Sequence, residues 1–172
     1  MATDAAGPLL VIIGPPGAGK TKVGKRVARR LGVPFADTDK TIVAEHGPIA
    51  DIFAEHGEPR FRAIEREHVE RALAGEGVVS LGGGAVLDPR TQADLHERRV
   101  ALITVSAEAV GERLQGEKRP LLASGGVAAW KALVEQRRPL YEALARRSFD
   151  SSSRPMDAVA DDVVAWLREE GL

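Results

Sequence analysis

Residues 14–21 constrain this chain more than any other segment. They read Gly-Pro-Pro-Gly-Ala-Gly-Lys-Thr and match the pattern G-x-x-x-x-G-K-[ST]. A short apolar run, residues 9–13, precedes them, and residues 21–31 follow with apolar side chains at helical spacing. Glycines let backbone N–H groups turn inward around phosphates, and a helix start adds a positive dipole. The segment therefore predicts a phosphate-binding loop between a strand and a helix.

The loop also predicts which atoms meet the nucleotide. We expect Lys20 to reach the β- and γ-phosphate oxygens of ATP and the Thr21 hydroxyl to ligate Mg²⁺. A chance glycine turn is the alternative, but such a turn seldom follows an apolar strand and opens a helix. The residues of this segment that are predicted to contact ATP are Gly17, Ala18, Gly19, Lys20, Thr21 and Lys22.

Apolar runs and helical spacing alternate along the whole chain. Short strands are expected at residues 9–13, 33–36, 78–81, 100–105 and 148–150. Helices are expected at residues 21–31, in pieces between 40 and 75 with breaks at Gly47-Pro48 and Gly57, at 88–99, after Ser106, at 127–147 with a kink or split at Pro139, and near the C-terminus. The alternation predicts an α/β fold with a five-stranded parallel sheet and helices on both faces.

Two carboxylates follow the second expected strand, in Asp37-Thr38-Asp39. Ligands of parallel sheets bind beyond the carboxyl ends of the strands. Residues two apart on extended chain face the same way, so both carboxylates are expected to point into that cleft. One would hold metal-bound water, and the other would accept a proton from a substrate hydroxyl. The alternative, that one of them only caps the following helix, stays open.

A second group of residues suits a small acidic acceptor. Phe53 and Phe61 beside Arg62 fit a small ring that bears a carboxylate, although core packing and a solvated helix face remain the alternative. Residues 82–84 are three glycines after the third strand, where the backbone is predicted to approach a ligand closely. Arg119, in an aperiodic segment expected to be a mobile lid, and Arg137 add two cations, and each is alternatively a surface residue.

Composition narrows the class of function. The 172 residues fit one domain, and a net charge of −1 argues against a nucleic-acid binder. The absence of cysteine excludes disulfides and thiolate metal sites and suits a reducing cytosol. The N-terminal segment has no positive region and no long apolar run, so neither a signal peptide nor a membrane span is expected. The histidines show no metal-ligand spacing and are expected at the surface: His46, His56, His68 and His96.

In this order, the motifs resemble those of the shikimate kinase family over nearly the whole chain, residues 9–167. The segments that carry the resemblance are Asp37-Thr38-Asp39 after the phosphate loop, Ala50-Asp51-Ile52-Phe53, Phe61-Arg62-x-Ile64-Glu65, Leu81-Gly82-Gly83-Gly84-Ala85, Arg119-Pro120-Leu121-Leu122 and Arg137-x-Pro139-Leu140-Tyr141.

The resemblance implies the P-loop NTPase fold of the nucleoside monophosphate kinase type. It implies one domain over residues 1–172, with a substrate-binding helical segment at about 38–75 and a lid at about 115–126. The implied reaction is phosphorylation of the 3-hydroxyl of shikimate with ATP and Mg²⁺, in the pathway to chorismate. The resemblance further implies a cytoplasmic monomer with no nucleic-acid or membrane partner.

Roles for single residues follow from the same resemblance. Asp39 would bind the acceptor hydroxyls and orient or deprotonate the attacking one, and it is implied to be catalytic together with Lys20 and Arg119. Arg62 and Arg137 would bind the substrate carboxylate, with Glu65 holding Arg62. The other implied contacts are Gly83 and Gly84 with the substrate, Phe53 and Phe61 as pocket walls, Arg154 against adenine, and Asp37 with Ser80 around the water of Mg²⁺.

Three features depart from the family pattern. Lys22 and Leu81 replace residues that are usually polar and uncharged, and a shortened segment at residues 113–119 leaves adenine stacking by Arg113 open.

A gluconate kinase or a nucleoside monophosphate kinase of the same fold is the nearest alternative. A noncatalytic ATP-binding module is another, whereas a motor ATPase is disfavoured because no apolar strand ends in an Asp-Glu pair.

Overall fold

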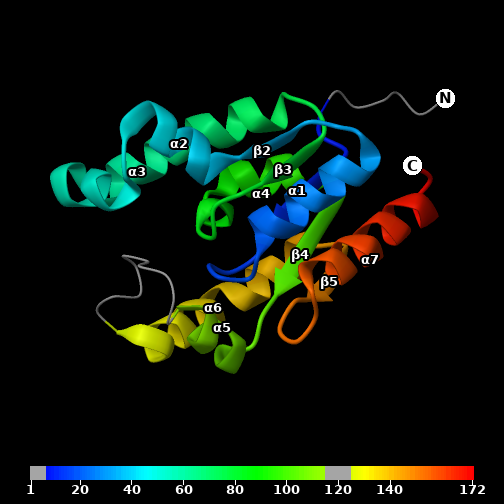
Figure 1. Ribbon diagram of the computed structural model, residues 1–172. Coiled ribbons are helices and arrows are strands. Elements are labelled where there is room, and N and C mark those ends of the chain that lie inside the picture. Colours follow the sequence, from blue (N-terminus) through cyan, green and yellow to red (C-terminus); the bar gives the residue numbers. More distant parts are fainter. Residues whose placement is uncertain (1–6, 115–124) are drawn as a thin grey trace.

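The computed structural model describes residues 7–114 and 125–172 (Figure 1). Five strands form one parallel sheet in the order β2-β3-β1-β4-β5. The strands are β1 (Leu10–Ile13), β2 (Phe35–Asp37), β3 (Val78–Ser80), β4 (Val100–Thr104) and β5 (Arg147–Asp150). The predicted fold class is confirmed, whereas most of the predicted lid, including Arg119, lies outside the described residues.

Helices connect the strands and cover the sheet. They are α1 (Lys20–Leu31), α2 (Thr38–His46), α3 (Ile49–Leu73), α4 (Pro89–Leu95), α5 (Ala107–Leu114), α6 (Gly126–Leu144) and α7 (Met156–Glu169), with a 3₁₀ turn η1 at Ala85–Leu87. The expected breaks are confirmed, because α2 ends at Gly47 and the backbone of Gly57 inside α3 is not helical. None of the described helices is long and apolar enough to cross a membrane.

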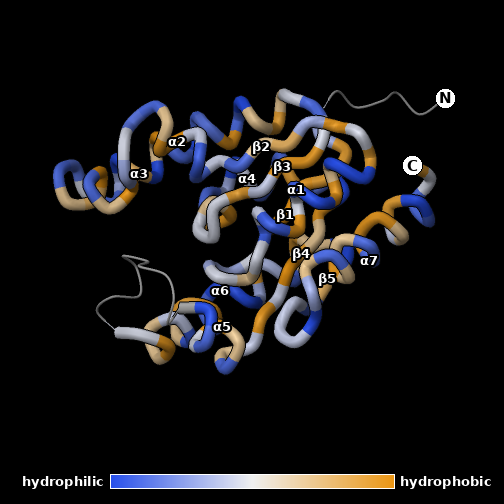
Figure 2. Tube along the Cα trace, viewed as in Figure 1, coloured by the Kyte–Doolittle hydropathy of each residue, from blue (hydrophilic) through white to orange (hydrophobic). Residues whose placement is uncertain are grey.

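Alternate side chains of strands β1 to β4 supply two separate cores. Leu10 and Ile12 of β1 pack with the apolar residues of α1 and α7, whereas Val11 and Ile13 pack with those of α3, α4 and α6. The central strands accordingly carry hydrophobic residues almost throughout (Figure 2). A sheet buried on both faces explains why short, continuous apolar runs mark its strands in the sequence.

The paired helices α2 and α3 extend away from the sheet (Figure 1). The second half of α3 packs on the sheet through Val69 and Leu73. The rest of the pair has a small apolar core of its own, formed by Ile42, Ile52, Phe61 and Ile64. This arrangement holds the start of α2 and the middle of α3 beside the carboxyl ends of the strands.

Two helix boundaries differ from the prediction. Helix α4 ends at Leu95, four residues early, because the next residues bring no buried apolar side chain that would extend the helix. Helix α6 runs through Pro139 without a split and ends at Leu144, so Arg147 belongs to β5. Pro139 has no N–H to donate to the carbonyl of Glu135, one turn earlier in the helix. Both residues are exposed, so water can supply the missing hydrogen bond.

Asp88 begins α4 as the sequence predicts, since its carboxylate accepts a hydrogen bond from the backbone N–H of Arg90 at 2.8 Å. We expect Asp88→Ala to lower the free energy of unfolding by about 1 kcal/mol, measured by urea denaturation. Asp88→Asn is the matched control, because asparagine caps equally well and an exposed ion pair with Arg90 contributes little. Equal losses in both variants would contradict a capping role.

Candidate active site

The phosphate-binding loop joins β1 to α1. Gly19, the residue before the helix, has φ of 92°, and a methyl group there would lie 2.5 Å from Cε of Met156. Both the backbone angle and the lack of space therefore require glycine. The ammonium group of Lys20 donates hydrogen bonds to the carbonyls of Gly14 (2.8 Å) and Pro15 (3.0 Å), so it lies over the loop.

Three side chains from distant segments hold the carbonyl groups of this loop. Trp130 Nε1 donates to Pro16 O (2.7 Å), and Arg113 Nη1 donates to Gly17 O (2.8 Å). The buried Ser151 hydroxyl donates to the carbonyl of Ala18 at 2.6 Å. When these donors hold the carbonyl groups on the outer side of the loop, the backbone N–H groups point to its inner side. A phosphate-binding site requires this orientation. No local pattern in the sequence marks Trp130 or Ser151 as a partner of this loop.

The three residues predicted around Mg²⁺ lie together. The Thr21 hydroxyl donates a hydrogen bond to Asp37 Oδ2. Asp37 ends β2 and pairs in register with Ser80 of β3, which is buried. Hydroxyl and carboxylate oxygens are the ligand type that Mg²⁺ prefers, so the residues present fit that ion.

Asp37 and Asp39 reach the site in different ways. Asp37 Oδ1 accepts a hydrogen bond from the N–H of Lys40 at 3.2 Å, so this carboxylate does cap α2. The prediction that both carboxylates lie on extended chain was wrong, because the helix begins at Thr38 and Asp39 lies in its first turn. Asp39 nevertheless faces the site, since a methyl group on Gly82 would lie 2.5 Å from its Oδ1.

The glycines at 82–84 bring the site side chains together. A methyl group on Gly84 would lie 2.4 Å from Nη1 of Arg62. One on Gly83 would lie 3.1 Å from Cδ of Pro16 in the phosphate loop and 3.5 Å from Nη1 of Arg137. The absence of side chains thus lets Asp39, both arginines and the phosphate loop approach the same short segment.

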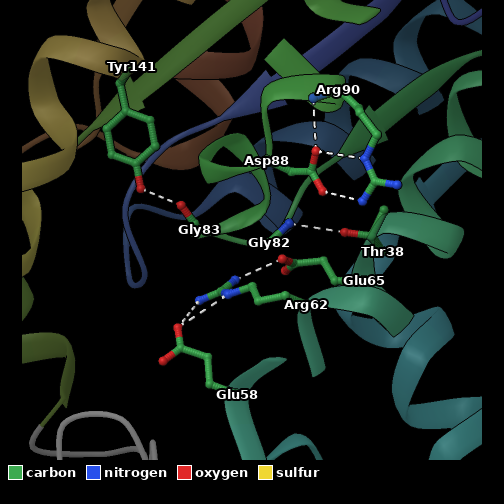
Figure 3. A network of polar contacts seen from close by, with 9 residues as sticks. All are labelled: Thr38, Glu58, Arg62, Glu65, Gly82, Gly83, Asp88, Arg90 and Tyr141. Carbon is green, nitrogen blue, oxygen red and sulfur yellow. Dashed lines mark hydrogen bonds and ion pairs between the residues drawn. The ribbon is translucent and has the colours of Figure 1, made fainter. Parts of the chain in front are cut away.

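Buried polar groups fix the arginine and this glycine segment (Figure 3). Arg62 Nη1 donates to Oε1 of Glu65 at 2.7 Å, and the Glu65 side chain is only 5% exposed. Burial raises the pKa of Glu65, although the neighbouring charge of Arg62 opposes that shift. The Tyr141 hydroxyl donates to the carbonyl of Gly83 at 2.6 Å, and burial raises the pKa of Tyr141.

The other predicted residues lie farther from this segment or have structural contacts. Phe53 and Phe61 stack with ring centroids 4.8 Å apart, and Phe61 is buried in the small core of α2 and α3. The core-packing alternative therefore applies to Phe61, while Phe53 is only partly buried. Arg154 pairs with Asp162 of α7 at 2.6 Å, and Lys22 is exposed on α1.

Two guanidinium groups beside a phosphate-binding loop suit a small anionic acceptor, because planar donors bind a carboxylate with fixed geometry. The parallel sheet places the guanidinium groups of Arg62 and Arg137 next to the phosphate-binding loop. This combination is that of a P-loop kinase that acts on a small molecule. The chain belongs to the shikimate kinase family, whose model, described as shikimate kinase, matches residues 16–168.

Known members of the family are similar over nearly their full length. The chain is 48% identical over 162 residues to the shikimate kinase of Saccharopolyspora erythraea, with 91% of this chain and 92% of the relative covered. It is 44% identical over 167 residues to that of Thermobifida fusca, with 95% and 97% covered. The structure of shikimate kinase from Acinetobacter baumannii in complex with shikimate aligns with a TM-score of 0.88 at 28% identity, covering 98% of this chain and 97% of that one.

Glu65 predicts a measurable pH dependence of stability. Because its pKa in the folded protein lies above the ordinary 4.5, folding gains most from this group at low pH and loses that gain as pH rises from 4.5 through the raised value. Glutamine does not titrate, so the free energy of unfolding of Glu65→Gln, minus that of the wild type, should increase over this range. Urea unfolding at several pH values measures this difference, and a constant difference would contradict a raised pKa of Glu65.

Proposed function

We propose that this chain transfers the γ-phosphoryl group of ATP to the 3-hydroxyl of shikimate, giving shikimate 3-phosphate and ADP on the route to chorismate and the aromatic amino acids. The observation that carries the proposal is the convergence of Asp39, Arg62 and Arg137 on the glycine segment 82–84, next to the phosphate-binding loop. A compact acid with several hydroxyl groups matches two cations and one carboxylate arranged in this way.

On the acceptor side, Arg62 and Arg137 bind the substrate carboxylate, and the backbone at Gly83 and Gly84 contacts the ring. Asp39 accepts a hydrogen bond from the 3-hydroxyl and orients it toward the phosphoryl group, taking its proton as the bond to phosphorus forms. Positioning supplies most of the acceleration, because phosphoryl transfer has a loose transition state that needs little covalent assistance. Phe53, which is partly buried, forms a wall of the pocket.

Arg62 is placed to exchange one carboxylate partner for another. Its bond to the buried Glu65 is short, at 2.7 Å, whereas its contacts with the exposed Glu58 are both 3.4 Å long (Figure 3). We infer that the substrate carboxylate replaces Glu58 while Glu65 keeps the guanidinium in orientation.

On the nucleotide side, Lys20 and the N–H groups of Gly17, Ala18 and Gly19 bind the phosphates. Thr21, Asp37 and Ser80 would hold Mg²⁺, which would supply positive charge against the β- and γ-phosphates. Arg119 meets the transferred group, and Arg154 lies against the adenine. We further propose that the protein acts as a cytoplasmic monomer with no nucleic-acid or membrane partner.

We expect Asp39→Asn to lower kcat by at least about 10²-fold, because the hydroxyl loses its proton acceptor while size is preserved. ATP binding, measured by calorimetry, should be unchanged. Asp51→Asn, in the first turn of α3, is the matched control and should keep full activity. Near-normal turnover of the Asp39 variant would remove Asp39 from the mechanism.

The glycine segment gives a second prediction. In Gly84→Ala, the new methyl group meets the guanidinium of Arg62 and displaces it from Glu65. Losing a charge-assisted contact to the substrate should raise the KM for shikimate about tenfold or more, with the KM for ATP unchanged. An unchanged KM for shikimate would contradict the role of Arg62.

The direct test of the function is ADP release with Mg·ATP and, in parallel, shikimate, gluconate, AMP or no acceptor. The proposal predicts release that depends on shikimate alone. Release with gluconate or AMP would keep the fold and overturn the roles of Arg62 and Arg137. No acceptor-dependent release, with ATP still bound, would favour a noncatalytic ATP-binding module.

A further inference from the structure

One histidine is not at the surface, contrary to the sequence-based expectation. His68 of α3 is 3% exposed and faces the end of α2, which lies beside it (Figure 1). Glu45 and His46, in the last turn of α2, approach it there. Each of the three residues offers one ligand atom, and these atoms all lie within 4.8 Å of one another.

The contacts of Thr41 favour one tautomer of His68. The Thr41 hydroxyl donates its only proton to the carbonyl of Thr38 at 3.0 Å. It therefore accepts a hydrogen bond from Nδ1 of His68, 2.9 Å away. A neutral His68 then carries its proton on Nδ1, and a lone pair on Nε2.

That lone pair is buried and faces other electron-pair donors. Among the described residues, Nε2 of His68 makes no hydrogen bond. It lies 3.4 Å from Oε2 of Glu45, and Nε2 of His46 lies 3.8 Å from the same oxygen. The lone pair on Nε2 of His68 thus lies against a carboxylate oxygen without a hydrogen-bond partner among the described residues, and a cation between these two atoms would stabilise the arrangement. A metal ion placed there would also accept Nε2 of His46 as a ligand.

Arg71 orients the carboxylate of Glu45. Its Nη1 lies 2.8 Å from Oε1 and its Nη2 lies 3.3 Å from Oε2. Its shorter bond is to Oε1, so Oε2 remains directed at the two histidines.

We propose that Oε2 of Glu45 and the Nε2 atoms of His46 and His68 form a binding site for a divalent transition-metal ion of the zinc type. Two imidazoles and a carboxylate are a donor set that zinc favours, with a fourth position for water. Glu45 and His46 are exposed, and a pocket of about 250 Å³ beside them, lined partly by Thr41 and His68, gives the ion access. Thr41 serves as the outer partner that orients a metal-bound histidine.

Such an ion would join the end of α2 to α3. Helix α2 begins with Thr38 and Asp39, and α3 carries Arg62 and Glu65 within two turns of His68. The ion would therefore stabilise the helix pair that presents the acceptor-binding residues. It would differ from Mg²⁺ in both place and chemistry, because imidazole nitrogen is a poor ligand for Mg²⁺.

The test uses the full chain without a polyhistidine tag, stripped of metal and titrated with ZnCl₂ in excess Mg²⁺ without nucleotide. We expect one equivalent of Zn²⁺ to bind and to raise the Tm, and Co²⁺ to give the visible absorption of a four-coordinate site. His46→Asn should lose both effects, whereas His56→Asn should keep them. His56 is the matched control, because it is exposed and lies 3.7 Å from the carboxylate of its neighbour Glu55.

Two further variants test the buried part of the site. His68→Asn should also abolish Zn²⁺ binding; if it does not fold, the exposed His46 variant decides alone. Thr41→Val should weaken binding about 10–100-fold by releasing the histidine ring. Absence of Zn²⁺ binding, or equal binding by the wild type and His46→Asn, would overturn the proposal. So would an NMR spectrum with both ring nitrogens of His68 protonated in the presence of Zn²⁺.

Discussion

The site depends on three consecutive residues that have no side chain. Asp39 lies against Gly82, Arg137 and the phosphate loop lie against Gly83, and Arg62 lies against Gly84. A methyl group at Gly82 or Gly84 would fall inside 2.6 Å of a charged atom, closer than any unbonded contact allows. The segment follows β3, next to the central strand β1, so helices that are distant in the sequence meet above the middle of the sheet.

A buried partner holds one charged side chain near this segment, Arg62, in a fixed orientation. Glu65 loses hydration on burial, and its bond to Arg62 offsets part of that loss. Arg62 thereby keeps one fixed partner and one weak, exposed partner before a ligand arrives. An arginine that is already oriented loses less conformational entropy on binding than a mobile one, and this favours affinity for a small acid.

Much of the fold follows from local sequence. Strands buried on both faces appear as continuous apolar runs, and Gly47 and Gly57 interrupt helices because their backbone angles lie outside the helical region. Helix ends were less predictable. Helix α4 stops at Leu95, its last buried residue, although the sequence predicted a helix that continues to residue 99.

Local sequence identified the phosphate loop, because eight adjacent residues build it. The contacts of Trp130 and Ser151 with that loop join segments more than a hundred residues apart, and no spacing predicts them. His68 did carry a signal that could have been read. It lies four residues after the buried Ile64 and one before the buried Val69, on the face of α3 that turns inward.

The convergence of Asp39, Arg62 and Arg137 on the glycine segment is the central claim, and a crystal structure with shikimate, ADP and Mg²⁺ tests it most directly. The account predicts the substrate carboxylate between the two guanidinium groups, with Glu65 still bound to Arg62 and Glu58 displaced. It also predicts the 3-hydroxyl within hydrogen-bond distance of Asp39. A shikimate carboxylate bound away from both arginines, or a 3-hydroxyl out of reach of Asp39, would contradict it.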